Sequence, residues 1–165
     1  MDFWATFLGA AFGVVAGTVV QYVFQVAIER RNRKLLLTDL RKEAQYNLGV
    51  VNDMLKEVDR FRAAAQPAIF STYHWIFRSK DMLGLALNRM ISSGQLYRMF
   101  NAREITEIQQ LQQFFNPHME EQFVANRIDQ LRDTKDIAGA HQFADLLDGA
   151  MKKGIATLTS LANKK

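Results

Sequence analysis

The amino-terminal part of this chain is dominated by a long run without any charged side chain. Residues 3–28, 26 positions in all, contain no Asp, Glu, Lys or Arg, and the basic cluster Arg30, Arg31, Arg33 and Lys34 follows at once. A helix rises about 1.5 Å per residue, so this run reaches about 39 Å, whereas the hydrocarbon layer of a bilayer is about 30 Å thick. The run therefore predicts one tilted transmembrane helix, with the basic cluster as its stop.

A secretory signal peptide is the alternative for this run. Such a peptide has a positive segment before an apolar core of about 7–15 residues. Here Asp2 is the only charged side chain before the run, and the run is too long for a signal core. Lys and Arg accumulate on the cytoplasmic side of a span, and Arg41 and Lys42 extend the cluster that follows this one. We therefore expect the amino terminus outside the membrane and the rest of the chain in the cytoplasm.

Glycines recur at four-residue spacing inside the predicted span. They are Gly9, Gly13 and Gly17, and Gln21 and Gln25 continue the same side of the helix. Small residues at this spacing let a second helix backbone approach closely, and a membrane glutamine gains from a hydrogen bond across the contact. The pattern predicts a helix-packing ridge that associates with itself or with other membrane proteins. Glycine is also frequent in spanning helices in general, so a ridge without a partner stays an alternative.

The composition fits one small domain after the span. The 137 residues after Ile28 suffice for a single hydrophobic core, and the chain has no cysteine for disulfide or thiolate chemistry. The net charge is +4, but six of the 21 basic residues lie between Arg30 and Lys42, beside the predicted membrane. Anionic lipid head groups are therefore the expected partners of Arg30, Arg31, Arg33 and Lys34, at about 1 kcal/mol each, rather than nucleic acid. A role in topology alone is the alternative.

Apolar residues after the basic cluster follow a seven-residue pattern that is typical of a helix in a bundle. The pattern occupies Leu37, Leu40, Ala44, Asn47, Val51, Met54, Val58 and Phe61, and Leu48 and Leu55 widen it. No proline occurs before Pro67, so one helix is expected from about Phe3 to about Ala64. Asn47 is predicted to fix the register or oligomeric state of the bundle, unless it is solvated or satisfied within its own chain.

The remaining sequence predicts shorter helices and no strand. A helix around 80–91 ends at the turn residues 92–94, and Asn101 with Glu104 forms a capping box that opens the next helix. Pro117 is expected to break that helix, and 133–136 to link the last two. The apolar positions of these three helices are Ile105, Ile108, Leu111 and Phe115, then Met119, Phe123, Ile128 and Leu131, then Ile137, Ala140, Ala144, Leu147, Met151, Leu158 and Leu161.

The predicted fold class is therefore all-α. One amino-terminal transmembrane helix continues into a long amphipathic helix that packs in a cytoplasmic helical bundle. Three segments are expected: an anchor over 1–28, the basic segment with the long helix over 29–66, and the remaining helices over 67–165. The span, the helix containing Leu40 to Asn47, and the Gly94 to Phe100 segment before a capped helix resemble small uncharacterised single-pass membrane proteins of bacteria. This resemblance implies a membrane-tethered helical domain, in a bacterial inner membrane, and no functional residue.

Catalytic signatures are scarce in this sequence. His118 with Glu121 and His141 with Asp145 share helical faces, but exposed ion pairs explain such spacing as well as a metal or catalytic site does. No phosphate-binding loop or nucleophile elbow occurs. We therefore expect no enzyme, cofactor or metal, and a membrane-anchored protein that acts by association. A membrane-perturbing or pore-forming effector, with Gln21 and Gln25 facing a lumen, is the alternative, and a ligand sensor is a third reading.

Overall fold

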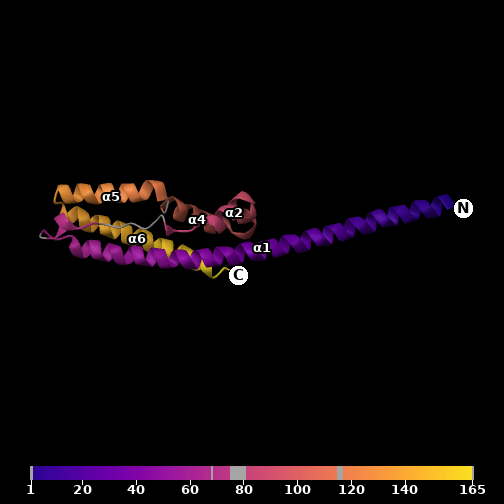
Figure 1. The fold of residues 1–165 in the computed structure, drawn as a ribbon, viewed down its shortest axis with the longest axis horizontal. Coiled ribbons are helices and arrows are strands. Elements are labelled where there is room, and N and C mark those ends of the chain that lie inside the picture. Colours follow the sequence, from indigo (N-terminus) through magenta and orange to yellow (C-terminus); the bar gives the residue numbers. More distant parts are fainter. Residues whose placement is uncertain (1, 68, 75–80, 115–116, 165) are drawn as a thin grey trace. The chain divides into compact units, whose positions relative to one another are not determined.

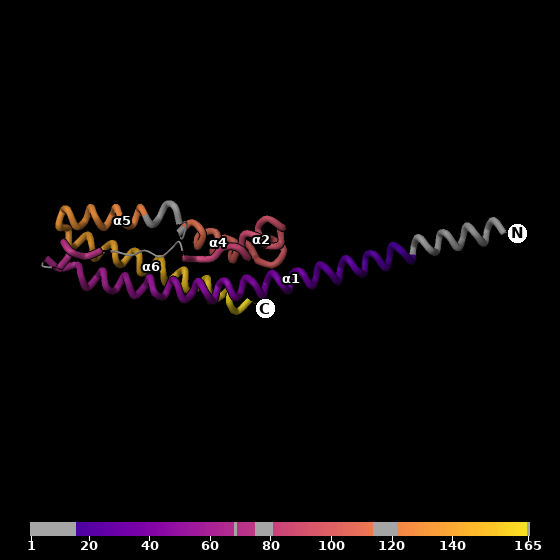
Figure 2. Tube along the Cα trace, viewed as in Figure 1, coloured from indigo at the N-terminus to yellow at the C-terminus, as the bar shows by residue number. Residues whose placement is uncertain are grey.

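The computed structural model describes the backbone of residues 2–67, 69–74, 81–114 and 117–164, and the side chains of 16–67, 69–74, 81–113 and 122–164 (Figures 1 and 2). Every regular element in this part of the chain is helical. The chain forms two compact units, residues 1–38 and residues 39–165. The predicted all-α fold is confirmed.

Helix α1 (Asp2–Ala64) is the longest element, and its bounds confirm the prediction of one helix over about 3–64. It supplies the first unit and the opening helix of the second. Every residue of this helix has a backbone N–H to donate, because the first proline of the chain is Pro67. Between the basic cluster and the end of α1, Gly49 is the only glycine. Over the part of the chain whose side chains are described, no helix is both long and apolar enough to cross a bilayer. Residues 3–15 of the predicted span lie outside that part.

The second unit is a helical bundle arranged around α6 (Ile137–Ala162). Helices α4 (Ala102–Phe114) and α5 (Pro117–Asp133) both contact α6, and the 39–64 part of α1 lies beside it (Figure 1). Arg41 donates to the carbonyl oxygen of Lys164 (2.5 Å), and Arg62 pairs with Asp145 (3.0 Å). Because low numbers on α1 meet high numbers on α6, the two helices run antiparallel.

The core of this bundle is the predicted seven-residue pattern of α1 packed on α6. The buried positions of this pattern on α1 are Leu40, Ala44, Asn47, Val51, Met54, Val58 and Phe61, and those predicted on α6 that are buried are Ala140, Ala144, Leu147, Met151, Leu158 and Leu161. Leu37 and Ile137, at the ends of the two patterns, are partly exposed. The ring of Phe61 contacts those of Phe70, Tyr73 and Phe143, with centroids 5.6–6.5 Å apart. Burial of each large side chain stabilises the unit by about 1.5–3 kcal/mol.

Short elements lie at both ends of the bundle (Figure 1). A 3-10 helix, η1 (Phe70–Thr72), contacts α5, while α2 (Leu85–Ser92) packs on α3 (Gln95–Met99), which in turn contacts α4. Between α2 and α3 the chain turns at Gly94, whose φ of 68° is accessible to glycine at little cost. The predicted turn at 92–94 is thus confirmed.

Several helix ends follow local sequence signals. Glu104 N–H donates to Asn101 Oδ1 (3.0 Å), and Asn101 N–H donates to Glu104 Oε2 (2.9 Å), so the predicted capping box is present. Helix α5 begins at Pro117, as predicted. Asp136 caps α6 by accepting from the backbone N–H of Gly139 (2.8 Å).

Two sequence predictions in the bundle differ from the structure. The helix expected around 80–91 begins only at Leu85, because residues 82–84 have no regular secondary structure and Leu83 binds Asn47 of α1 instead. Phe123, expected among the apolar positions of α5, is 62% exposed, and Val124 is buried in its place with Ile128 and Leu131. The spacing of four and three residues from Val124 sets the face that α5 packs on the bundle.

Candidate interaction surfaces

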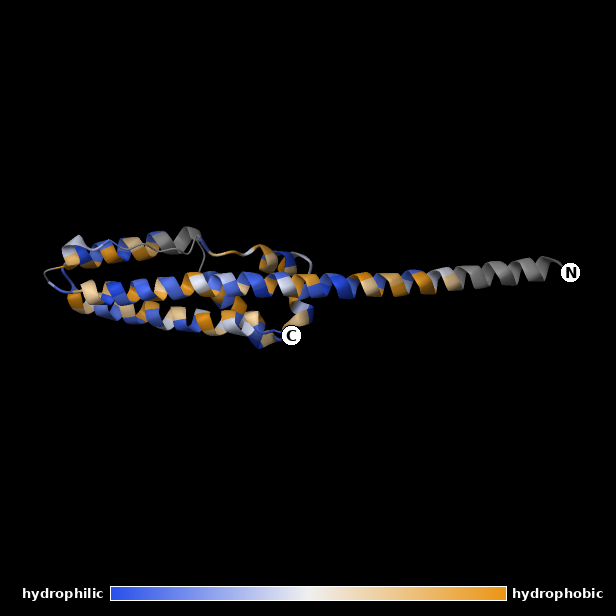
Figure 3. Ribbon diagram, turned by 60° about the horizontal axis from the view of Figure 1, so that its bottom comes forward, coloured by the Kyte–Doolittle hydropathy of each residue, from blue (hydrophilic) through white to orange (hydrophobic). Residues whose placement is uncertain are grey.

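The described part of the uncharged run exposes apolar side chains over most of its circumference. Six of the seven large apolar residues over 19–28 are 54–67% exposed, namely Val19, Val20, Tyr22, Val23, Phe24 and Ile28, and Val26 is partly exposed. Successive helix positions lie about 100° apart, so these six side chains cover about two thirds of the circumference of α1, and Thr18, Gln21 and Gln25 lie in the remaining sector. Figure 3 draws this part of α1 mostly in hydrophobic colours. Apolar side chains over most of a helix surface require cover on those sides.

The predicted glycine ridge is described only at its carboxyl end. Gly17 and Gln21 are exposed, and a Cβ added at Gly17 would have no atom within 4 Å in this chain. Gly9 and Gly13 lie outside the described residues. At Gly17 the helix backbone is therefore open to close approach by another helix.

The four basic residues after the run occupy different environments. Arg33 pairs with Glu29 of the preceding turn (2.7 Å), whereas Arg30, Arg31 and Lys34 are exposed. A depression of about 540 Å³ on the helix surface is lined by these three cations together with Tyr22, Val23, Val26 and Ala27. One side of α1 thus joins an apolar strip directly to three positive charges.

Asn47 lies buried in the bundle and binds the main chain of Leu83 at two points. Its Nδ2 donates to the carbonyl oxygen of Leu83, and its Oδ1 accepts from the N–H of Leu83, both at 2.8 Å. This geometry matches the alternative in which the Asn47 side chain forms its hydrogen bonds within its own chain. Its predicted role in register stays a prediction.

Glu43, one turn before Asn47, caps the amino terminus of α2. Its carboxylate accepts from the N–H groups of Ala86 (2.7 Å) and Leu87 (3.3 Å), which have no partner inside the helix. A buried carboxylate at this end is also favoured by the helix dipole. Glu43 and Asn47, which we call the clasp, hold the 83–87 segment against α1. The sequence reasoning missed Glu43, although two polar residues spaced by four inside an apolar pattern were a usable signal.

A cavity of about 370 Å³ lies beside the clasp. Leu40, Ala44, Leu87, Leu111, Leu158 and Leu161 supply apolar walls, and Asn88 and Gln112 add amide groups. Its volume and lining suit a small, mostly apolar molecule. The Glu43 and Asn47 side chains already form hydrogen bonds to the 83–87 backbone. Asn88 and Gln112 are therefore the polar groups of the wall that could form hydrogen bonds to such a molecule.

A second hollow, of about 470 Å³, lies between α4 and α6. Glu107 and Leu111 of α4 face Leu146, Gly149 and Lys153 of α6 across it. Leu146 is 61% exposed, and a Cβ at Gly149 would have no atom within 4 Å. An open glycine next to an exposed leucine gives this hollow the shape and apolar character of a protein contact.

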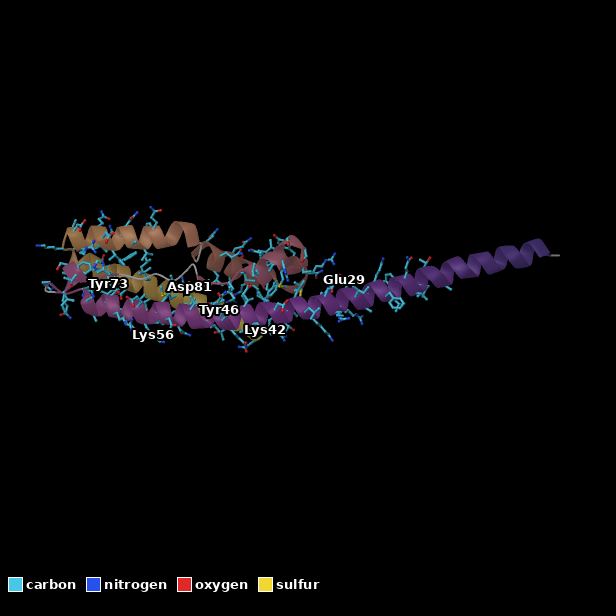
Figure 4. The ribbon with its side chains drawn as sticks, viewed as in Figure 1. Glu29, Lys42, Tyr46, Lys56, Tyr73 and Asp81 are labelled. Carbon is cyan, nitrogen blue, oxygen red and sulfur yellow. The ribbon has the colours of Figure 1, made fainter. Side chains whose placement is uncertain are left out.

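Two titratable groups of the bundle, Tyr73 and Asp145, have structural partners. Tyr73, labelled in Figure 4, donates its hydroxyl to Glu57 Oε1 (2.7 Å), and burial together with this hydrogen bond raises the pKa of Tyr73 above its usual range. Asp145, the predicted partner of His141, binds Arg62. His118 and Glu121 lie outside the described side chains. Within the described part of the chain, no three His, Asp or Glu residues gather in a way that could hold a metal ion.

No protein-family model, curated protein or solved structure matches this chain. The surfaces described above are therefore the basis for the function proposed below.

Proposed function

We propose that this chain is a non-enzymatic membrane-anchored helical protein that acts by association, as an accessory subunit or a self-assembling scaffold. The observation that carries the proposal is the exposed apolar surface of α1 over 16–28. Burying one large apolar side chain is worth about 1.5–3 kcal/mol, so six exposed ones in water are strongly unfavourable. Lipid acyl chains cover such an apolar surface.

The sequence around the anchor supports the same proposal. The uncharged run over 3–28 has the length of one crossing, and the exposed Arg30, Arg31 and Lys34 suit the cytoplasmic head-group layer. The amino terminus then lies outside and the helical bundle in the cytoplasm, in a bacterial inner membrane. A mitochondrial or other organellar membrane is the alternative host.

Two surfaces support association. Gly9, Gly13, Gly17 and Gln21 form the ridge within the span, where close backbone approach replaces the hydrophobic effect as the driving force. In the bundle, the hollow between α4 and α6 exposes Leu146 beside Gly149. Together they give one contact within the membrane and one outside it.

Anchoring and orientation are tested with a single cysteine. The chain has none, and Gly49→Cys places one at an exposed position of α1 where a side chain meets nothing within 4 Å. In bacterial cells, we expect the chain to stay in the membrane after alkaline extraction and the introduced thiol to react with an impermeant maleimide only after permeabilisation. Release of the chain by alkali would refute the anchor. Labelling of the introduced thiol in intact cells would show that the orientation is the opposite of the proposed one.

Association is tested by native mass spectrometry of the full chain extracted in mild detergent. A homo-oligomer supports the scaffold, and co-purification with other membrane proteins at fixed stoichiometry supports the accessory subunit. A monomer without partners would contradict both.

A pore-forming or membrane-perturbing effector is the second candidate. The exposure of Gln21 and Gln25 on one side of α1 favours it, because polar residues that face a common axis line conducting pathways. Clustering of the bundles should then collapse the membrane potential, measured with a voltage-sensitive dye. A potential that survives induced clustering would exclude this candidate.

A further inference from the structure

The depression on α1 between Tyr22 and Lys34 combines two chemistries on one helix face. Val23, Val26 and Ala27 form its apolar part, and Arg30, Arg31 and Lys34 its basic part. The recurrence at three and four residues keeps both parts on the same side of the helix. We call these residues, with Tyr22, the mixed face.

Arg33 differs from the other three cations of its cluster. Its guanidinium binds the Glu29 carboxylate at 2.7 Å, and neither residue lines the depression. The charge of Arg33 is thus compensated locally, while the mixed face carries three exposed cations and no acidic residue. The net charge of the cluster is therefore directed to one side of α1.

We propose that the mixed face binds one phospholipid that carries two phosphate groups, such as diphosphatidylglycerol. The inference rests on the proposed membrane anchor, and it deepens that function by naming the lipid. Arg30, Arg31 and Lys34 lie within about 6 Å along the helix axis, which is one turn. A phosphodiester carries one negative charge, so one phosphate would leave two of the three positive charges uncompensated, whereas two phosphates would leave only one.

Arginine suits this ligand because its guanidinium donates two parallel hydrogen bonds to a phosphate, and Lys34 adds a point charge. Val23, Val26 and Ala27 continue from the cations toward the uncharged run, so acyl chains attached to the phosphates lie along an apolar strip. Tyr22 borders the same strip with a ring suited to the membrane interface. This continuity favours a lipid over a free polyphosphate.

The test compares two double variants of the full chain, each of which removes two positive charges from residues 30–42. Arg31→Gln with Lys34→Gln alters the mixed face, and Arg33→Gln with Lys42→Gln is the matched control. Native mass spectrometry in mild detergent counts the lipid retained when diphosphatidylglycerol or phosphatidylglycerol is added at equal total charge. We expect the unaltered chain and the control to retain the two-phosphate lipid at least five-fold better, and the mixed-face variant to lose this preference.

Three results would overturn the inference. They are equal retention of both lipids by the unaltered chain, equal loss of preference in both double variants, and complete competition by inorganic pyrophosphate at equal phosphate concentration. Alkaline extraction of the same proteins separates this failure from failure of the anchor. A chain that resists extraction but shows no lipid preference keeps its anchor and loses only the lipid site, whereas a chain released by alkali loses the anchor.

Discussion

At the scale of single residues, Glu104 connects two parts of the bundle. It completes the capping box with Asn101 and also binds Lys164 Nζ at 2.5 Å, and the Lys164 ammonium lies 4.7 Å from the centroid of the Phe100 ring. The hydrogen bond from Lys164, followed by that from the Asn101 backbone, lowers the pKa of Glu104. The charged carboxylate is therefore favoured by folding.

Replacing Glu104 by Gln should lower the free energy of unfolding by about 0.5–1 kcal/mol at pH 7, because Gln keeps the capping-box acceptor but loses the charge that pairs with Lys164. Because the folded pKa lies below the unfolded one, the stability that Glu104 contributes is present at neutral pH. It decreases below about pH 4 and is lost as the pH falls through the folded pKa. Urea unfolding of both proteins from pH 7 to pH 3 measures this difference. A difference that stays constant with pH would contradict the ionic role of Glu104.

Replacing each of two glycines of α6 by alanine should change the stability in opposite directions. A Cβ at Gly139 would overlap the side chains of Asp136 and Leu131, whereas a Cβ at Gly149 would meet nothing within 4 Å. Gly139→Ala should therefore lower the melting temperature although alanine favours helices. Gly149→Ala should raise the free energy of unfolding by about 0.5–1 kcal/mol, since it only reduces the entropy cost of the helix. Thermal unfolding of both variants, followed by circular dichroism, measures the two changes in melting temperature. Changes in the same direction would contradict the difference in space around the two glycines.

At the scale of elements, α2 depends on α1 for its amino-terminal cap. The backbone N–H groups of Ala86 and Leu87 are satisfied by Glu43, a residue more than 40 positions earlier in the sequence. A local sequence window contains no sign of this partner, so the predicted start near residue 80 was wrong by about one turn. The capping box at 101–104 was predictable because both of its residues lie in the same window.

Replacing Glu43 by Gln should loosen α2 without unfolding the bundle. The amide retains one acceptor oxygen in place of two and carries no charge toward the helix dipole. Amide hydrogen exchange at Ala86 and Leu87 should accelerate at least ten-fold, while the amides of α6 should change less than two-fold. Asp59→Asn, which alters an exposed carboxylate on the same helix but remote from α2, is the control. Uniform acceleration in both helices would show global destabilisation instead.

The long helices were predictable because their apolar periodicity extends over several turns. Seven of the eight positions in the pattern of α1 are buried, and the one that is not, Leu37, stands at its edge. Helix α5 has a weaker signal. Phe123 lies four residues after Met119, whereas Val124 lies four residues before Ile128, so the neighbouring apolar residues favour different choices and the packing on α6 selects Val124.

At the scale of the whole molecule, association within the membrane depends on residues that repeat on one side of the span. Gly13 lies at the centre of the predicted ridge, and Ala11 faces the opposite side of the same helix. Gly13→Leu should reduce crosslinked oligomer in membranes at least five-fold, because its side chain keeps the backbones apart. Ala11→Leu should leave the oligomer unchanged. Equal crosslinking in both variants would show that the ridge takes no part in the assembly.

The surfaces at this scale were only partly predictable. The uncharged run and the basic cluster are contiguous in sequence, so both could be recognised directly. That Arg33 is compensated by Glu29, while its neighbours are exposed, depends on side-chain geometry within one turn. The hollow between α4 and α6 joins residues about 40 positions apart, and no local pattern indicates it.

The clasp has a consequence for how this sequence can change over time. Glu43 and Asn47 bind only main-chain atoms of Leu83, Ala86 and Leu87, and every residue except proline offers the same atoms. Mutations along the held segment can therefore accumulate without cost to these hydrogen bonds, whereas almost any exchange at the two holding positions removes them. Among descendants of a common ancestor, we expect positions 43 and 47 to drift far more slowly than the exposed position 83.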